Sequence, residues 1–236
     1  MCNRIQKCFI GGKYSDEIKE LNALGIETIS LPANDLLDEE INSHADILVF
    51  NCLNGTIIAD SGLKGEIEPY LTGFNLLFEK GVKSPYPDDI MLNAANLGDA
   101  VVCNTKFISS QIIDFANENN IKLIHTRQGY AKCNLCVLNN KTIITEDDNL
   151  ACLLNNSQYS VLKITPGYID LSDKHHGFIG GASAKISDGE IYFSGDISSH
   201  PDYKLIYEFI TKAGIKPIFN KNRPLKDFGG IIPIIW

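Results

Sequence analysis

The residues of this 236-residue chain best suited to chemistry are three aspartates, Asp46, Asp89 and Asp227, each near the start of an apolar segment. If the fold brings such carboxylates together, they repel one another, and their pKa values rise unless a cation lies among them. A guanidinium group is planar and carries five donors, so it suits paired carboxylates through forked hydrogen bonds. The three residues therefore predict an acidic pocket for a guanidino or other cationic small molecule. The alternative is that each aspartate caps a strand or a turn at the surface.

Two further residues could carry out catalysis at such a pocket. Cys133 follows Lys132, whose charge would lower the pKa of the thiol and favour the nucleophilic thiolate. His44 starts another apolar segment, where an imidazole could act as a general base. Asn93 could orient a ligand or tie neighbouring strands together, and the same alternatives hold for Asn51. The competing interpretation is a packing role for Cys133 and an ordinary hydrogen-bonded position for His44.

The remaining histidines and cysteines do not predict a metal site. Cys133 and Cys136 form a single CxxC, without the second pair that a structural zinc site requires. His175 and His176 are adjacent, so their side chains would diverge on an extended strand. His200 falls at the start of a predicted helix, where capping explains it. We therefore expect no metal and no cofactor, and we expect the seven cysteines to be mostly buried, reduced thiols.

These residues lie in a chain of repeated elements, of which residues 177–220 are the clearest example. A strand over 178–186 is followed by a tight turn and by a second strand over 190–194. A helix begins near Ser199, with Pro201 in its first turn and apolar residues at helical spacing after it. A third strand covers 215–219. At the start of this repeat, Gly180 and Gly181 would leave room for a ligand that neighbouring repeats hold.

The same order of strand, strand, helix and strand recurs with a period of roughly 40 to 45 residues, which is typical of repeat architectures. Further repeats are expected over 45–81, 86–124 and 130–164; in the first of these, a helical pattern covers 65–81 and the third strand is short or displaced. Residues 8–31 supply a strand, a helix and a strand. The apolar strand 227–236 supplies the missing first strand of that repeat. The two ends would pair and close a ring, which removes exposed sheet edges.

The predicted fold class is α/β: a closed five-bladed α/β propeller of ββαβ repeats with pseudo-fivefold symmetry, as a single domain over residues 1–236. The first strands of such a ring line its axis, so the candidate aspartates would converge there together with His44 and Cys133. The competing arrangement is an ordinary layered α/β sheet in which the element order is coincidental. A doubly wound nucleotide-binding sheet is disfavoured, because Gly180 and Gly181 precede a strand rather than a helix.

Five repeats of this kind resemble the pentein, or guanidino-group-modifying-enzyme, fold. Dimethylarginine dimethylaminohydrolase, arginine deiminase, agmatine deiminase and the amidinotransferases share that fold, and so does a non-enzymatic ribosome anti-association factor. More closely, residues 86–90, 128–133, 144–147, 177–181 and 227–233 resemble an uncharacterised bacterial family of the same fold. The resemblance implies cleavage of a guanidinium by a cysteine thiolate after the Gly-rich first strand of the last repeat. Here that strand is 227–236, and no cysteine follows Cys152.

Two classes of function are consistent with these residues. The first is a binding protein with an axial acidic pocket for a guanidino or other cationic small molecule, lacking the usual C-terminal cysteine. The second is a hydrolase or amidinotransferase-like enzyme that acts on C–N bonds of a guanidino or amidino compound and uses relocated catalytic residues. The missing cysteine favours the first.

Composition narrows the possible partners further. The formal net charge is −8, and no basic run is present, so we expect no nucleic acid partner. The longest apolar runs are far shorter than the roughly 20 residues of a membrane helix, so we expect no membrane partner. The first residues show no apolar signal segment, which predicts a cytoplasmic location. The sequence does not indicate an oligomeric state.

Overall fold

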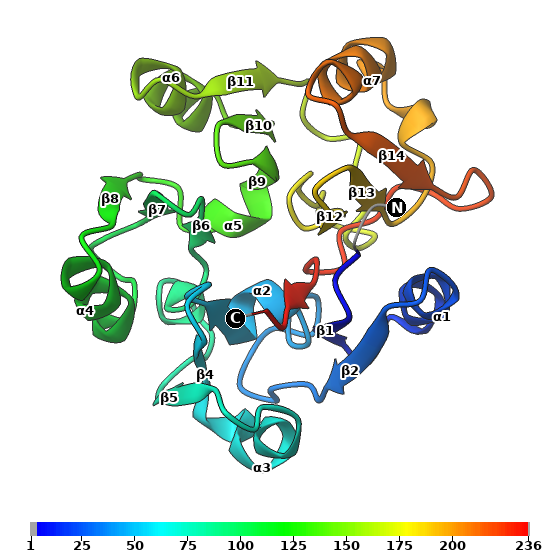
Figure 1. Ribbon diagram of the computed structural model, residues 1–236. Helices are drawn as coiled ribbons and strands as arrows, with labels where there is room; N and C mark the ends of the chain where they lie inside the picture. The colour runs from blue at the N-terminus through cyan, green and yellow to red at the C-terminus, as the bar shows by residue number, and fades with distance from the viewer. Residues whose placement is uncertain (1–3, 236) are drawn as a thin grey trace. The chain divides into compact units, whose positions relative to one another are not determined.

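The predicted order of strand, strand, helix and strand recurs five times in the computed structural model, which describes residues 4–235. Each repeat forms a separate three-stranded sheet, in which the middle strand pairs antiparallel with the first strand and parallel with the third. The chain divides into two lobes. The first lobe contains residues 5–131 and 231–235, and the second lobe contains Arg4 and residues 132–230. Figure 1 labels most of the helices and strands of both lobes.

Three of the sheets belong to the first lobe, with the strand orders β15-β1-β2, β3-β4-β5 and β6-β7-β8. Their strands are β1 (Lys7–Gly11), β2 (Glu27–Leu31), β3 (Val49–Asn51), β4 (Thr56–Asp60), β5 (Asn75–Glu79), β6 (Ala95–Asn96), β7 (Ala100–Cys103), β8 (Lys122–His125) and β15 (Ile232–Pro233). The helical elements are α1 (Ser15–Ala23), α2 (Ala45–Leu48), η1 (Ser61–Leu63), α3 (Lys64–Ile67), η2 (Glu68–Tyr70), η3 (Asp88–Ile90) and α4 (Ser110–Glu118).

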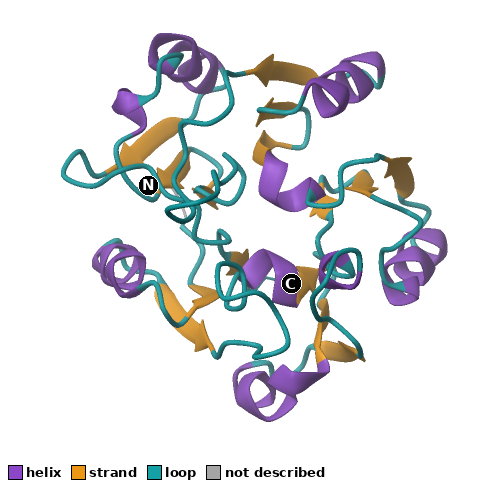
Figure 2. Cartoon of the chain, turned by 180° about the vertical axis from the view of Figure 1, so that it is seen from behind, coloured by secondary structure: helices purple, strands orange, loops and turns teal. Residues whose placement is uncertain are grey.

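The second lobe contains two sheets, with the strand orders β9-β10-β11 and β12-β13-β14. Their strands are β9 (Leu135–Asn139), β10 (Thr142–Thr145), β11 (Ser160–Lys163), β12 (Ser183–Ser187), β13 (Glu190–Phe193) and β14 (Lys216–Phe219). The helical elements are α5 (Ala131–Asn134), which begins at the last residue before the boundary between the lobes and precedes β9, then α6 (Asp148–Asn156), η4 (Ile197–Ser199) and α7 (Tyr203–Lys212). Figure 2 shows helices, in purple, alternating with strands, in orange, along the chain.

The repeat that is split between the two ends of the chain has the predicted pairing. The C-terminal strand β15 pairs antiparallel with β1, with Ile232 opposite Phe9 and Pro233 opposite Cys8. In Figure 1 this strand, in red, lies beside the blue N-terminal strand. Asn51 Nδ2 also donates to the Pro233 carbonyl at 2.6 Å, which ties β15 to the neighbouring sheet. The tie is one of the two roles expected for Asn51.

The predicted first strands of the repeats are too long, because helical turns occupy their starts. The expected strand over 45–51 begins with the helix α2, and the expected strand over 130–138 begins with α5. The segment that opens at Tyr86 forms η3, and strand pairing starts only at Ala95. Residues 45–51 are buried throughout and residues 131–138 almost throughout, so these sequences carry no periodicity that separates a helical turn from a strand.

The helix predicted over 65–81 was also wrong. The helical elements there end at Tyr70, after Pro69, and Asn75–Glu79 is the strand β5. This strand pairs parallel with β4 over five residue pairs, from Thr56 with Asn75 to Asp60 with Glu79. Backbone pairing with a neighbour therefore decides the structure of a segment whose apolar spacing also fits a helix.

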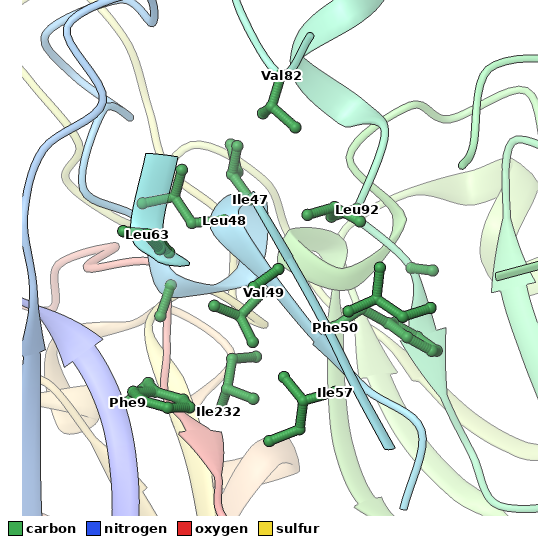
Figure 3. Close-up of a cluster of buried hydrophobic side chains, with 14 of the residues drawn as sticks. Phe9, Ile47, Leu48, Val49, Phe50, Ile57, Leu63, Val82, Leu92 and Ile232 are labelled. Carbon is green, nitrogen blue, oxygen red and sulfur yellow. The ribbon is translucent and has the colours of Figure 1, made fainter. Parts of the chain in front are cut away.

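Each lobe has its own apolar core. Figure 3 shows the core of the first lobe, where Phe9 and Ile232 from the split repeat approach Val49 and Ile57 of the next sheet. Burial of each such side chain contributes roughly 1.5–3 kcal/mol. The side chains of Ser109 and Asp147 cap α4 and α6 by accepting backbone N–H hydrogen bonds.

The described cysteines are all present as thiols, as expected, and Cys2 lies outside the described residues. Burial raises the pKa of Cys8, Cys52 and Cys103 to about 12 and that of Cys136 to about 11. These four thiols therefore stay protonated and pack as small apolar groups.

Candidate functional site

Two of the predicted site residues form a buried pair in the first lobe. His44 precedes α2, and its carbonyl accepts hydrogen bonds from Ile47 and Leu48, so the turn starts immediately after the imidazole. His44 Nδ1 lies 4.0 Å from Asp46 Oδ1, and each residue is only 1% exposed. The ring of Tyr14 lies 5.8 Å from the imidazole ring. At this separation the two groups do not form a direct hydrogen bond, and only a protonated imidazole would attract the carboxylate electrostatically.

Asn93 lies beside this pair. Its Nδ2 donates to the Asp46 carbonyl at 2.9 Å, and its side chain is fully buried. The bond joins the segment before β6 to α2, so Asn93 ties two repeats of the first lobe together. Orienting a ligand, the other role predicted for Asn93, stays a prediction.

Asp89 is another buried carboxyl group of the first lobe. It lies in η3, is 2% exposed, and accepts a hydrogen bond from the Tyr130 hydroxyl through Oδ2 at 2.5 Å. Its other oxygen, Oδ1, is buried and has no hydrogen-bond partner among the described residues. Burial raises the pKa of Asp89. The Tyr130 hydroxyl and the backbone N–H of Asp89 oppose that rise, and the charges of Asp38 and Asp88 add to it. An ionised Asp89 therefore lacks one donor.

Asp227 lies in the second lobe, where both of its carboxylate oxygens accept hydrogen bonds from backbone N–H groups. Its Oδ2 accepts from the Phe178 N–H and its Oδ1 accepts from the Gly229 N–H, each at 2.9 Å. An added Cβ at Gly181 would collide with Asp227 Oδ1. The Asp227 carboxylate thus fills the space beside Gly181 that was predicted to hold part of a ligand. The hydrogen bonds hold the 177–181 and 227–230 segments together.

Lys132 and Cys133 lie on the helical turn α5 rather than on a strand. Cys133 is 3% exposed, and its carbonyl accepts the Gly181 N–H at 2.9 Å. Lys132 Nζ lies 3.5 Å from the Gly180 carbonyl. Cys133 is thus buried, and the neighbouring Lys132 ammonium lies at the Gly180 carbonyl; activation of the thiol by that ammonium stays a prediction.

Sequence reasoning missed Glu146, the buried glutamate between β10 and α6. It is 6% exposed, and its Oε2 accepts the Ile179 N–H at 2.9 Å, while Oε1 has no hydrogen-bond partner among the described residues. Burial raises the pKa of Glu146 to about 7, and the Ile179 and Gly167 N–H groups and the charge of Lys163 oppose the rise. The only signal in the sequence is a Glu between an apolar strand and a helix cap.

The histidines that were set aside have other roles. His200 is 2% exposed; its Nδ1 accepts the Asp202 N–H at 3.0 Å, and its Nε2 lies 3.1 Å from the Thr165 carbonyl. This pattern requires the neutral tautomer with a proton on Nε2, and it fits the capping role. His175 and His176 are exposed. Within the described part of the chain, no three His, Cys, Asp or Glu side chains group as metal ligands.

The structure thus brings the site residues together in two sets. In the first lobe, His44, Asp46 and Asn93 are in contact, and Asp89 contacts Tyr130. In the second lobe, Asp227 and Cys133 both contact the 177–181 segment.

The five ββαβ sheets identify the class of protein: the chain has the pentein fold. It is similar, at 10% identity and a TM-score of 0.59, to DDAH from Pseudomonas aeruginosa complexed with citrulline, with 97% of each chain covered. It is similar to the inosamine-phosphate amidinotransferase of Streptomyces griseus, at 10% identity, coverage of 99% and 94%, and a TM-score of 0.57. A third similar structure is the agmatine deiminase of C. jejuni, at 10% identity, coverage of 92% and 87%, and a TM-score of 0.53.

The chain belongs to the Family of unknown function (DUF6873), whose model matches residues 9–232. The match includes all the site residues discussed above. A comparison with curated proteins finds no match. None of the helices in residues 4–235 is long and apolar enough to cross a membrane.

Proposed function

We propose that this protein binds a guanidino or other cationic small molecule at an acidic pocket that includes Asp89. The observation that carries the proposal is the buried Asp89 carboxyl group, whose Oδ1 has no donor among the described residues. An ionised carboxylate in that position is costly without a cation or a hydrogen-bond donor. A guanidinium supplies both the charge and the N–H groups.

The similar structures support this ligand class. They are named as a dimethylarginine dimethylaminohydrolase, an amidinotransferase and an agmatine deiminase. The chain shares the fold of these proteins at low sequence identity, and a shared fold does not establish a shared ligand. That this chain binds the same class of ligand is therefore part of the proposal. Asp46 and Asn93 would complete the ligand shell in the first lobe. Asp227 would act in the second lobe by fixing the 177–181 segment.

The proposal includes the closed five-repeat ring and a single domain over residues 1–236, with the pocket on the ring axis. It also includes a cytoplasmic location, no cofactor and no nucleic acid partner. One cooperative unfolding transition, seen alike by fluorescence and circular dichroism, would support the single domain. Two separated transitions would contradict it.

The alternative is catalysis on the same ligand, as a hydrolase or amidinotransferase-like enzyme. Cys133 would then be the nucleophile and His44 the base. The burial of Cys133 and the absence of any cysteine after Cys152 favour binding without turnover. Turnover of agmatine or arginine that Cys133→Ser abolishes would establish the enzyme. Turnover that this variant leaves unchanged would exclude Cys133 as its nucleophile.

The test of binding is calorimetry with guanidinium, agmatine, arginine and tetramethylammonium. Asp89→Asn keeps an acceptor for the Tyr130 hydroxyl but removes the negative charge. The affinity for the cation should therefore fall at least about tenfold, which is less than the usual cost of leaving a buried charge without its partner. The matched control is Asp114→Asn, an exposed aspartate on α4, which should leave the affinity unchanged. No binding of any of these cations to the unmodified protein, or equal losses in both variants, would overturn the proposal.

A further inference from the structure

Next to Asp89 lies a group of aromatic side chains that the proposed function does not yet use. Tyr86 and Phe107 are 49% and 40% exposed, and their ring centroids are 6.3 Å apart. The Tyr86 ring also lies 6.2 Å from the ring of Tyr130. We call these three residues the aromatic patch. Exposed aromatic rings that contact one another offer a flat apolar surface with a negative face, which binds planar groups and cations.

The aromatic patch is joined to the buried carboxyl group by direct contacts. Tyr130 is part of the patch, and its hydroxyl donates to Asp89 Oδ2 at 2.5 Å. Tyr86 packs against the backbone at Gly129, where an added Cβ would lie 2.5 Å from Tyr86 Cε2 and 3.1 Å from its hydroxyl. The positions of both tyrosine rings are therefore set by packing around the same backbone segment.

Two acidic side chains act on the Asp89 end of the patch. Asp88 is exposed and adjacent to Asp89 in sequence, and the charges of Asp38 and Asp88 both act on the Asp89 carboxyl group. The loop that carries Asp38 is bound to the loop before η3, because the Asp38 N–H donates to Ser84 Oγ at 3.0 Å. Acidic side chains around exposed aromatic rings favour a cation with an apolar part, and they disfavour an anion.

We propose that Tyr86 and Phe107 determine the specificity of the Asp89 site by covering the apolar substituent of its ligand. The inference rests on the proposed function and deepens it: the ligand is an aryl- or alkyl-substituted guanidine or amine rather than a bare cation. The cationic end binds Asp89, and the substituent lies on the rings of Tyr86 and Phe107. The unpartnered Asp89 oxygen and the exposed rings beside it are the two independent observations that support this assignment.

The experiment compares guanidinium, butylguanidine and benzylguanidine by calorimetry. In the unmodified protein, benzylguanidine should bind at least about tenfold more tightly than guanidinium, given the usual strength of aromatic contacts. Tyr86→Ala should remove about fivefold of that preference while guanidinium binds as before. Tyr86→Phe keeps the ring and should retain the preference. The matched control is Tyr207→Ala, because Tyr207 is 44% exposed on α7 of the second lobe.

Three results would overturn the inference. If guanidinium binds but the substituted compounds bind no better, the patch does not contact the ligand, and the proposed function stands without it. If Tyr86→Ala and Phe107→Ala both keep the full preference, other residues cover the substituent. If none of the compounds binds, both proposals fail together. Phe107→Ala serves as the second variant should Tyr86→Ala unfold, because its ring is the other exposed one in the patch.

Discussion

Glu146 gives the sharpest prediction for the pH dependence of stability. Its carboxyl group is buried, its Oε2 accepts the Ile179 N–H, and burial raises its pKa from an ordinary 4.5 to about 7. A carboxyl group with a raised pKa in the folded state stabilises the protein fully below the pKa of the unfolded chain. That stabilisation is lost as the pH rises through the folded-state pKa. The affected window is therefore about pH 4.5 to 7.

The size of the effect follows from the pKa difference. At about 1.4 kcal/mol for each tenfold change in proton affinity, the difference between 4.5 and about 7 corresponds to about 3 kcal/mol. This value is an upper bound, because any water that reaches the ionised group reduces the cost of its charge. Glu146→Gln keeps an oxygen that can accept from Ile179 and cannot ionise. The free energy of unfolding of the variant should therefore lack this decrease between pH 4.5 and 7.

The assay is urea unfolding of the unmodified protein and of Glu146→Gln at pH 5, 6, 7 and 8. The difference between them should favour the variant by about 2 to 3 kcal/mol more at pH 8 than at pH 5. His200 titrates in an overlapping range, but it is present in both proteins, so its contribution cancels. Glu208→Gln, an exposed glutamate on α7, is the control and should leave the pH profile unchanged. Parallel profiles for the unmodified protein and Glu146→Gln would refute the reasoning.

Three further predictions concern the second lobe. Gly181→Ala should lower the free energy of unfolding by about 2 kcal/mol, because the new methyl group collides with Asp227. In the control Gly65→Ala, the new methyl group has no atom within 4 Å, so this change should be neutral or stabilising. Equal melting temperatures for the two variants would contradict the prediction. Burial lowers the pKa of His200, so the stabilising effect of the neutral imidazole is present above about pH 6.5 and is lost as the pH falls. In urea unfolding, the free energy of unfolding of His200→Gln should therefore decrease less at acid pH than that of the unmodified protein. An equal decrease in the two proteins would count against this prediction. In Cys152→Ser, the rapid reaction of the folded protein with a thiol reagent should fall by one thiol, and no change would show that the exposed Cys152 is protected.

The repeated order of elements could be predicted from the sequence because it depends on local features. Turn residues, helix caps and apolar spacing act over a few residues, so they identify the elements of 177–220 and of the split repeat. The antiparallel pairing of β15 with β1 followed from counting the elements, since one repeat lacked a strand and the chain ended with one.

The details of the candidate site required the structure. The starts of the first strands at His44, Asp89 and Cys133 are helical turns, and nothing in their spacing distinguishes these turns from strands. Asp227 has the residue type of a ligand-binding carboxylate, but backbone N–H groups occupy both of its oxygens. Hydrogen-bond partners that are distant in sequence decide the role of such residues.

The sequence by itself therefore determined the ββαβ repeat and the number of repeats, and it predicts a set of residues for binding a cation. Only the tertiary structure decided which carboxyl groups are buried and which donors they receive. Burial and hydrogen bonding set the pKa of a carboxyl group, and both depend on residues that are distant in the chain. Glu146 shows this dependence, because its ionisation is controlled by burial and by the N–H of Ile179, 33 residues further along the chain.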